Sequence, residues 1–128
     1  MKQVCFMEFK IGIDSVEIER IKKSIEKESF VKRVYGEKEL FELKEKNMAA
    51  QSAAACFCAK EAFSKAIGTG VTGFNLNEVE TLHNEKGKPY LVFSGDAKKI
   101  VDESGLSFDI SVTHTDTVAT AVVIAFKE

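Results

Sequence analysis

Residues 49–70, AAQSAAACFCAKEAFSKAIGTG, decide how this chain folds. The stretch is mostly small and uncharged and contains no proline, so it predicts one long helix from about Met48 to Ile67. A helix that is apolar around most of its circumference is normally buried. Gly68 follows as the expected C-cap, because a residue without a Cβ readily adopts the left-handed conformation. The rest of the chain is therefore expected to pack around this central helix.

Three charged residues interrupt the second half of the predicted helix: Lys60, Glu61 and Lys65. A carboxylate on a buried helix is unfavourable unless it is paired, hydrogen-bonded or bound to a metal, so Glu61 requires a partner. Lys65 lies one helical turn further on and could form an ordinary intrahelical salt bridge with it. Lys60 and Ser64 form a neighbouring polar strip, which is predicted to face solvent.

Upstream of this helix the pattern predicts one strand and two helices. Residues 4–13 are rich in β-branched and aromatic side chains and predict a strand. Apolar residues then recur at helical spacing. Asp14 or Ser15 is the expected N-cap, because their short side chains can accept the first free backbone N–H groups. A further helix is predicted over residues 37–46.

Downstream of Gly73 the pattern changes to that of strands. Four strands and one short helix are predicted: strands over residues 78–82, 90–93, 108–113 and 118–126, and a helix over 97–103. Gly87 indicates a hairpin loop between the first two strands, with Pro89 at a strand start. The last strand is almost wholly apolar, which places it inside a sheet rather than at its edge. Helices early and antiparallel strands late predict an α+β fold.

Composition narrows the class of protein. The 128 residues predict one domain over residues 1–128, and 45% hydrophobic and 30% charged residues are typical of a globular protein. The net charge of −2 and the lack of a basic block argue against nucleic-acid binding. Nothing resembles a membrane span or signal peptide. Three cysteines, an odd number, favour free thiols in the cytoplasm. Cys56 and Cys58 have no histidine nearby, so we expect core residues rather than a zinc site.

Asp14 and Glu61 are candidate metal ligands. Two carboxylates from separate elements, without a thiolate or histidine, supply the hard oxygen atoms that Mg²⁺ prefers. This ion commonly completes its coordination with water and substrate phosphates. On chemistry alone, helix capping by Asp14 and a salt bridge of Glu61 with Lys65 remain the simpler explanations. In the functional alternative, Lys65 neutralises phosphate charge or protonates a leaving oxygen.

His114 also admits two interpretations. It has the parity of the apolar residues of its predicted strand, which favours a packed histidine. The residues after it, 115–117, form a polar turn, which favours an exposed one. The Gly68–Gly70 segment, GTG, is a weak signal for phosphate binding because many helices end in glycine.

Five motifs occur together, in an order and spacing that resemble the holo-[acyl-carrier-protein] synthases, the small bacterial 4′-phosphopantetheinyl transferases. They are GIDSVEIERI at residues 12–21, Phe30 with Arg33, AKEAFSKAIGTG at 59–70, GKP at 87–89 and SVTHT at 111–115. The resemblance covers the chain from about Ile11. Residues 1–6 lie outside it and are expected to be a peripheral extension.

The resemblance implies a phosphopantetheinyl transferase-like α+β fold around a long central helix. It implies transfer of 4′-phosphopantetheine from coenzyme A to a serine of apo-acyl carrier protein, with Mg²⁺ as cofactor and adenosine 3′,5′-bisphosphate as product, in support of fatty acid biosynthesis. It also implies a homotrimer with sites between subunits, acting in the cytoplasm.

The resemblance assigns roles to individual residues as well. Asp14 and Glu61 match the Mg²⁺ ligands, and Glu61 or a metal-associated water would take the serine proton. Lys65 matches the lysine that assists the departing phosphate oxygen. Arg20 matches a basic residue facing the acidic carrier protein, where charge steers encounter. Coenzyme A contacts are expected at Lys60, Ser64, Gly68, Pro89, His114 and Thr115.

Two positions depart from the family pattern. Cys56 stands where an arginine usually helps to bind a coenzyme A phosphate, and Tyr35-Gly36 replaces a Phe-Thr pair. Losing the arginine removes a charge-assisted hydrogen bond of about 1.5–3 kcal/mol. The alternatives to an active transferase are a coenzyme A- or carrier-protein-binding module without turnover, and a structural α+β domain whose carboxylates only cap and pair.

Overall fold

The fold comes from a computed structural model, which describes residues 8–127. In chain order the elements are β1 (Glu8–Glu17), α1 (Ile18–Ser24), α2 (Glu28–Val34), α3 (Glu37–Glu45), α4 (Ala50–Ile67), the 3₁₀ turn η1 (Leu76–Glu78), β2 (Val79–His83), β3 (Pro89–Phe93), α5 (Gly95–Ser104), β4 (Ser107–His114) and β5 (Val118–Lys127). The mixture of helices and antiparallel strands confirms the predicted α+β class. No helix within residues 8–127 has the length and hydropathy needed to cross a membrane.

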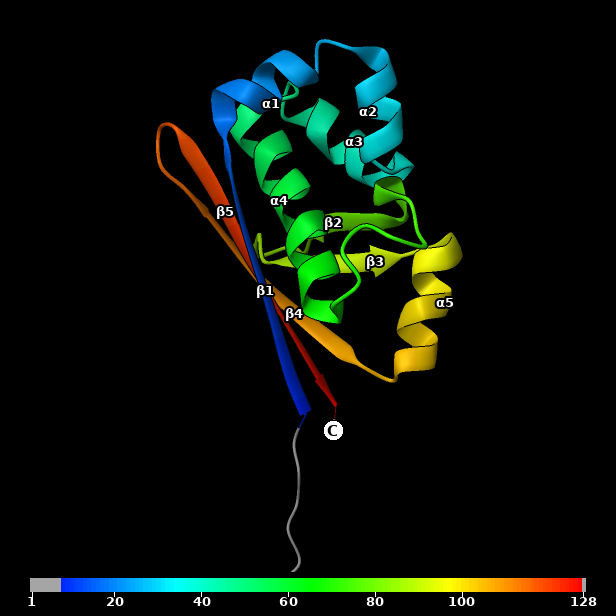
Figure 1. Cartoon of the computed structure of the whole chain (residues 1–128). Coiled ribbons are helices and arrows are strands. Elements are labelled where there is room, and N and C mark those ends of the chain that lie inside the picture. Colours follow the sequence, from blue (N-terminus) through cyan, green and yellow to red (C-terminus); the bar gives the residue numbers. More distant parts are fainter. Residues whose placement is uncertain (1–7, 128) are drawn as a thin grey trace, which may run out of the picture.

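A three-stranded antiparallel sheet and a two-stranded hairpin flank the long helix. The sheet has the order β1-β5-β4, so the apolar last strand is central, as predicted. One face of the sheet packs against α4, and β2 and β3 form the predicted hairpin with Pro89 as its first strand residue (Figure 1). Helices α1, α2 and α3 lie together at one end of the molecule, and α5 lies on the side away from the three-stranded sheet.

The contact between the sheet and α4 is built from small residues. The inward-facing residues of β5 are fully buried: Ala119, Ala121, Val123 and Ala125. On β1, a Cβ added to Gly12 would lie 1.9 Å from the carbonyl oxygen of Ala62 and 2.6 Å from the backbone nitrogen of Ala66. Any side chain at Gly12 would therefore push β1 and α4 apart.

The structure corrects the prediction at the end of β1. The strand continues through Asp14 to Glu17, and α1 begins only at Ile18, so neither Asp14 nor Ser15 caps a helix. The ladder with β5 extends over this whole segment and ends with Glu17 opposite Val118. The backbone of residues 14–17 therefore pairs with β5 and needs no helix cap. Residues 4–7 of the predicted strand lie outside the described part of the chain.

The other predicted elements are confirmed with small shifts of their ends. The central helix ends at Ile67, and Gly68 adopts the left-handed conformation with φ of +81°. The helix α2 was not predicted. It is short, and it is held by tertiary contacts such as the stacking of Phe30 on Phe57 of α4, with 6.2 Å between ring centroids.

Candidate active site

Two elements bring Asp14 and Lys65 together. Asp14 lies two residues after Gly12 on β1 and therefore on the same face, which packs against α4. The Lys65 ammonium of α4 lies 3.2 Å from Oδ1 of Asp14 and donates to the carbonyl of Ile13 at 3.0 Å. Among the described residues, Lys65 thus forms its ion pair across to β1, and not along the helix with Glu61.

Glu61 faces the same place. Burial raises the pKa of its carboxyl first, the negative charge of Asp14 raises it further, and Lys65 partly opposes both effects. The Cys58 thiol lies beside the two carboxylates: burial, and then the charge of Asp14, raise its pKa to about 12. Asp14, Glu61 and Lys65 therefore form one cluster of two acids and one cation at the contact between β1 and α4.

This cluster fits a magnesium ion. Its donors are carboxylate oxygens, and a divalent cation would relieve the repulsion between Asp14 and Glu61, which together with burial raises the pKa of Glu61. Within residues 8–127 no group of three or more acidic, histidine or cysteine side chains is arranged to enclose a metal. Mg²⁺ is commonly held by one or two carboxylates, with waters and substrate phosphates completing its coordination. Asp14 and Glu61 are the residues that would hold it.

The predicted solvent-facing strip of Lys60 and Ser64 is wrong. Both residues are buried, with 0% and 1% exposure. Ser64 Oγ donates to the Glu61 carbonyl at 2.7 Å within the helix. Lys60 can be buried on this face of α4 because Glu39 of α3 neutralises its charge.

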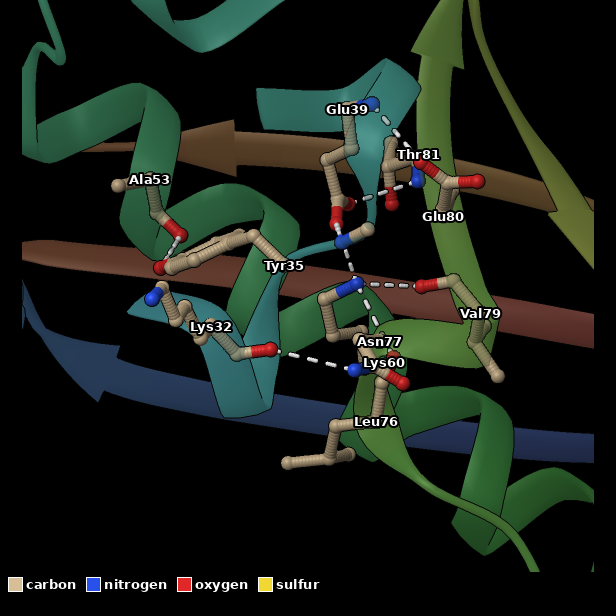
Figure 2. A network of polar contacts seen from close by, with 11 residues as sticks. Lys32, Tyr35, Glu39, Ala53, Lys60, Leu76, Asn77, Val79, Glu80 and Thr81 are labelled. Carbon is tan, nitrogen blue, oxygen red and sulfur yellow. Dashed lines mark hydrogen bonds and ion pairs between the residues drawn. The ribbon is translucent and has the colours of Figure 1, made fainter. Parts of the chain in front are cut away.

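Figure 2 shows the buried network around that ion pair. The Lys60 ammonium lies 2.5 Å from Oε1 of Glu39, donates to the Leu76 carbonyl at 3.3 Å, and also donates to the carbonyl of Val79. Oε2 of Glu39 accepts from the backbone N–H of Thr81 at 2.8 Å. Burial raises the pKa of the Glu39 carboxyl, whereas Lys60 lowers it. The sequence analysis did not identify Glu39.

A cavity of about 160 Å³ lies on another face of α4, between α3 and the ends of β2 and β4. Cys56 and His114 both line it, together with Lys46 and Thr81. The Thr81 hydroxyl is buried and has no hydrogen-bond partner among the described residues. His114 is exposed at the end of β4, which decides between the two interpretations of this residue. Within one chain, His114 thus lines a cavity distinct from the acidic cluster.

The remaining predicted residues lie outside the acidic cluster, and most of them are exposed. Thr115 Oγ1 accepts from the Val118 N–H at 3.1 Å and so stabilises the predicted turn. Gly68 and Arg20 are exposed, at the end of α4 and on α1, and Pro89 is half-buried. None of these residues contacts the acidic cluster in the described hydrogen bonds and ion pairs.

Comparisons with known proteins identify the family of this chain. The model of the 4′-phosphopantetheinyl transferase superfamily matches residues 10–123. The holo-[acyl-carrier-protein] synthase of Caldanaerobacter subterraneus subsp. tengcongensis is 43% identical over 121 residues, which are 93% of this chain and 95% of the relative.

Solved structures give the same result. The Neisseria meningitidis holo-[acyl-carrier-protein] synthase is similar with a TM-score of 0.84 at 30% identity, covering 91% of this chain and 96% of that chain. The Helicobacter pylori holo-[acyl-carrier-protein] synthase in complex with coenzyme A has a TM-score of 0.78 at 31% identity, covering 90% and 98%. Matches of this extent show that the chain belongs to the holo-[acyl-carrier-protein] synthases of the 4′-phosphopantetheinyl transferase superfamily.

Proposed function

We propose that this 4′-phosphopantetheinyl transferase moves the phosphopantetheine group of coenzyme A to a serine of apo-acyl carrier protein in a Mg²⁺-dependent reaction. The second product is adenosine 3′,5′-bisphosphate, and the reaction serves fatty acid biosynthesis in the cytoplasm. The observation that carries the proposal is the convergence of Asp14, Glu61 and Lys65 from β1 and α4. The names of the relatives and the coenzyme A in the H. pylori structure support the choice of substrates.

Each residue of the cluster has a distinct task. Asp14 and Glu61 would hold Mg²⁺, which when bound neutralises pyrophosphate charge. Glu61, or a water hydrogen-bonded to it, accepts the proton of the attacking serine. The Lys65 side chain is 54% exposed, so its ammonium can reach the phosphate oxygen that leaves with the nucleotide.

Coenzyme A contacts are proposed at the exposed residues Gly68, His114 and Thr115 and at the half-buried Pro89. Lys60 and Ser64 are too deeply buried for direct contact, so we assign them a structural part instead. Arg20 is exposed on α1 and remains our proposed contact for the acidic carrier protein.

A homotrimer is proposed through the outer face of the three-stranded sheet. Large apolar side chains are exposed on that face: Phe9, Ile11 and Ile13 on β1, and Ile124 on β5. Ile11 lies directly opposite Ile124 in the ladder, so these side chains form one continuous patch. Figure 1 shows no helix of residues 8–127 over this face. Exposed apolar surface of this kind marks a protein interface, and a subunit docked there would contact β1, the strand that carries Asp14 on its other face.

The test is incubation of the protein with apo-acyl carrier protein, coenzyme A and Mg²⁺, followed by intact-mass measurement of the carrier protein. We expect the mass gain of one phosphopantetheine group, and its loss when the metal is chelated. Asp14→Ala and Glu61→Ala should each abolish transfer while the far-ultraviolet circular dichroism spectrum stays unchanged. Wild-type rates in either variant would contradict the metal assignment, and the absence of any modification at any Mg²⁺ concentration would contradict the function.

One observation favours a second candidate, a coenzyme A-binding module without turnover. The Cys56 thiol lines the cavity, and a thiol supplies no positive charge where the family has an arginine. If the mass does not change but coenzyme A still binds in isothermal titration calorimetry, this second function is the correct one.

A further inference from the structure

The Lys60 ammonium is fixed in direction, because each of its three N–H groups has an acceptor. The acceptors come from three elements outside α4: Glu39 of α3, the Leu76 carbonyl of η1 and the Val79 carbonyl of β2. Glu39 is itself held, since its two carboxylate oxygens accept from the backbone N–H groups of Gly36 and Thr81. In Figure 2 the Lys60 side chain extends from α4 to these three acceptors.

Lys60 lies on the opposite side of α4 from the contact with β1. Successive residues of a helix are rotated by about 100°, so Ala62, which touches Gly12, lies about 200° around the axis from Lys60. Glu61 is intermediate, on the flank of the helix. Gly12 limits how closely α4 approaches β1, and Lys60 holds the helix from the far side.

Only two buried residues of α4 have large side chains, and the others are alanine, cysteine or serine. Phe63 packs against the rings of three other residues, Phe74, Phe93 and Phe108. Lys60 is the second residue that can fix the rotation of the helix. When the helix rotates, a residue on its flank changes its distance from β1 more than a residue that faces β1 directly. At a side-chain radius of about 6 Å, a rotation of about 10° shifts the Glu61 carboxylate by about 1 Å.

We propose that the Glu39–Lys60 ion pair sets the rotation of α4 and thereby aims Glu61 at Asp14, so that Lys60 and Glu39 are positioning residues for the metal-binding carboxylates. This inference rests on the proposed function for its catalytic consequence. The geometry behind it is independent of activity. Replacing a buried ion pair by neutral residues of similar size is often neutral for stability, so orientation is the property that the pair is expected to control.

The experiment uses the variant Glu39→Gln with Lys60→Met, which removes both charges and keeps the side-chain lengths. We expect kcat to fall about 10- to 100-fold while the KM for coenzyme A stays within about twofold. The dissociation constant for Mn²⁺ alone, from line broadening of backbone amide signals near Asp14, should rise about 10-fold. Glu39→Asp keeps the charges but shortens the side chain, and it should lower kcat and Mn²⁺ affinity as well.

The control is Val34→Ala. Val34 is a fully buried residue of α2 outside the ion-pair network, and shortening its side chain leaves a cavity there. It should lower the melting temperature yet keep kcat and Mn²⁺ affinity. A folded double variant or Glu39→Asp variant with the kcat and Mn²⁺ affinity of the wild type would overturn the proposal. So would a Val34→Ala protein that loses both as strongly. If the wild type transfers no phosphopantetheine, the proposed function fails, whereas the Mn²⁺ comparison still decides the positioning.

Discussion

Replacing Gly12 by alanine tests whether the close approach of β1 to α4 sets the geometry of the active site. The added Cβ would lie 1.9 Å from the Ala62 carbonyl oxygen, whereas ordinary van der Waals contact begins at 3.4 Å. Strand and helix must therefore separate by about 1.5 Å, or the helix must rotate by an equivalent amount. Overpacking of this kind destabilises a fold by about 1–3 kcal/mol.

The larger effect is expected on catalysis. Asp14 lies on the same face of β1 as Gly12, so it moves away from Glu61 and Lys65 with the strand. A displacement of about 1 Å at a reacting centre can reduce the rate about 100-fold. We therefore expect Gly12→Ala to retain its fold, with a melting temperature several degrees lower, and to lose about two orders of magnitude in kcat.

The assay combines thermal unfolding with initial rates of carrier-protein modification at saturating Mg²⁺ and coenzyme A. Val34→Ala again serves as the control, because it lowers stability at a buried residue of α2 and not of β1 or α4. A folded Gly12→Ala protein with the kcat of the wild type would refute the reasoning. Equal losses of kcat in the two variants would show that stability, and not active-site geometry, is responsible.

Three further predictions concern charge, pH and assembly. Lys65→Met should lower kcat about 100- to 1,000-fold, because a donor to the developing charge is lost, but should change the free energy of unfolding by less than about 1 kcal/mol, because the ion pair is partly exposed. The raised pKa of Glu61 means that the folded chain holds this proton more tightly than the unfolded chain. In metal-free buffer, stability is therefore lost as pH rises from the ordinary glutamate pKa through the raised value. Glu61→Gln should then be more stable than the wild type at pH 7 but not at pH 4, and equal differences in melting temperature at both pH values would contradict this. Ile11→Glu, in the exposed patch of β1, should yield monomers in light scattering, and a trimer of unchanged mass would exclude this face as the interface.

The sequence predicted an end of a helix or strand correctly where a residue at that end determines it. Gly68 ends α4 because of its backbone freedom, and Pro89 begins β3 because it cannot donate to the ladder. Asp14 was wrongly expected to cap a helix, because a contact with a distant part of the chain decides its conformation. Its short side chain and the apolar spacing after it suit a helix cap, but pairing with β5, more than a hundred residues later, keeps the chain extended.

The sequence singled out the three residues that the structure brings together, Asp14, Glu61 and Lys65, but not the contacts between them. The motif around Glu61 and Lys65 identified the residues, and helical spacing suggested that these two pair with each other. In the structure β1 crosses α4 here, so Lys65 pairs with Asp14. Glu39 and Lys60 are 21 positions apart on different helices, and no spacing rule connects them. Because the sequence did not reveal Glu39 as its partner, Lys60 was wrongly predicted to face solvent.

The alanine-rich seam between β5 and α4 restricts how this enzyme can vary. Ala119, Ala121 and Ala125 are fully buried, and at such positions every replacement except glycine adds atoms to a space that is already filled. In a saturation mutagenesis screen these positions should accept almost nothing, whereas the neighbouring Val123 should accept smaller residues. Relatives can alter this seam only by paired changes, in which one side shrinks as the other grows.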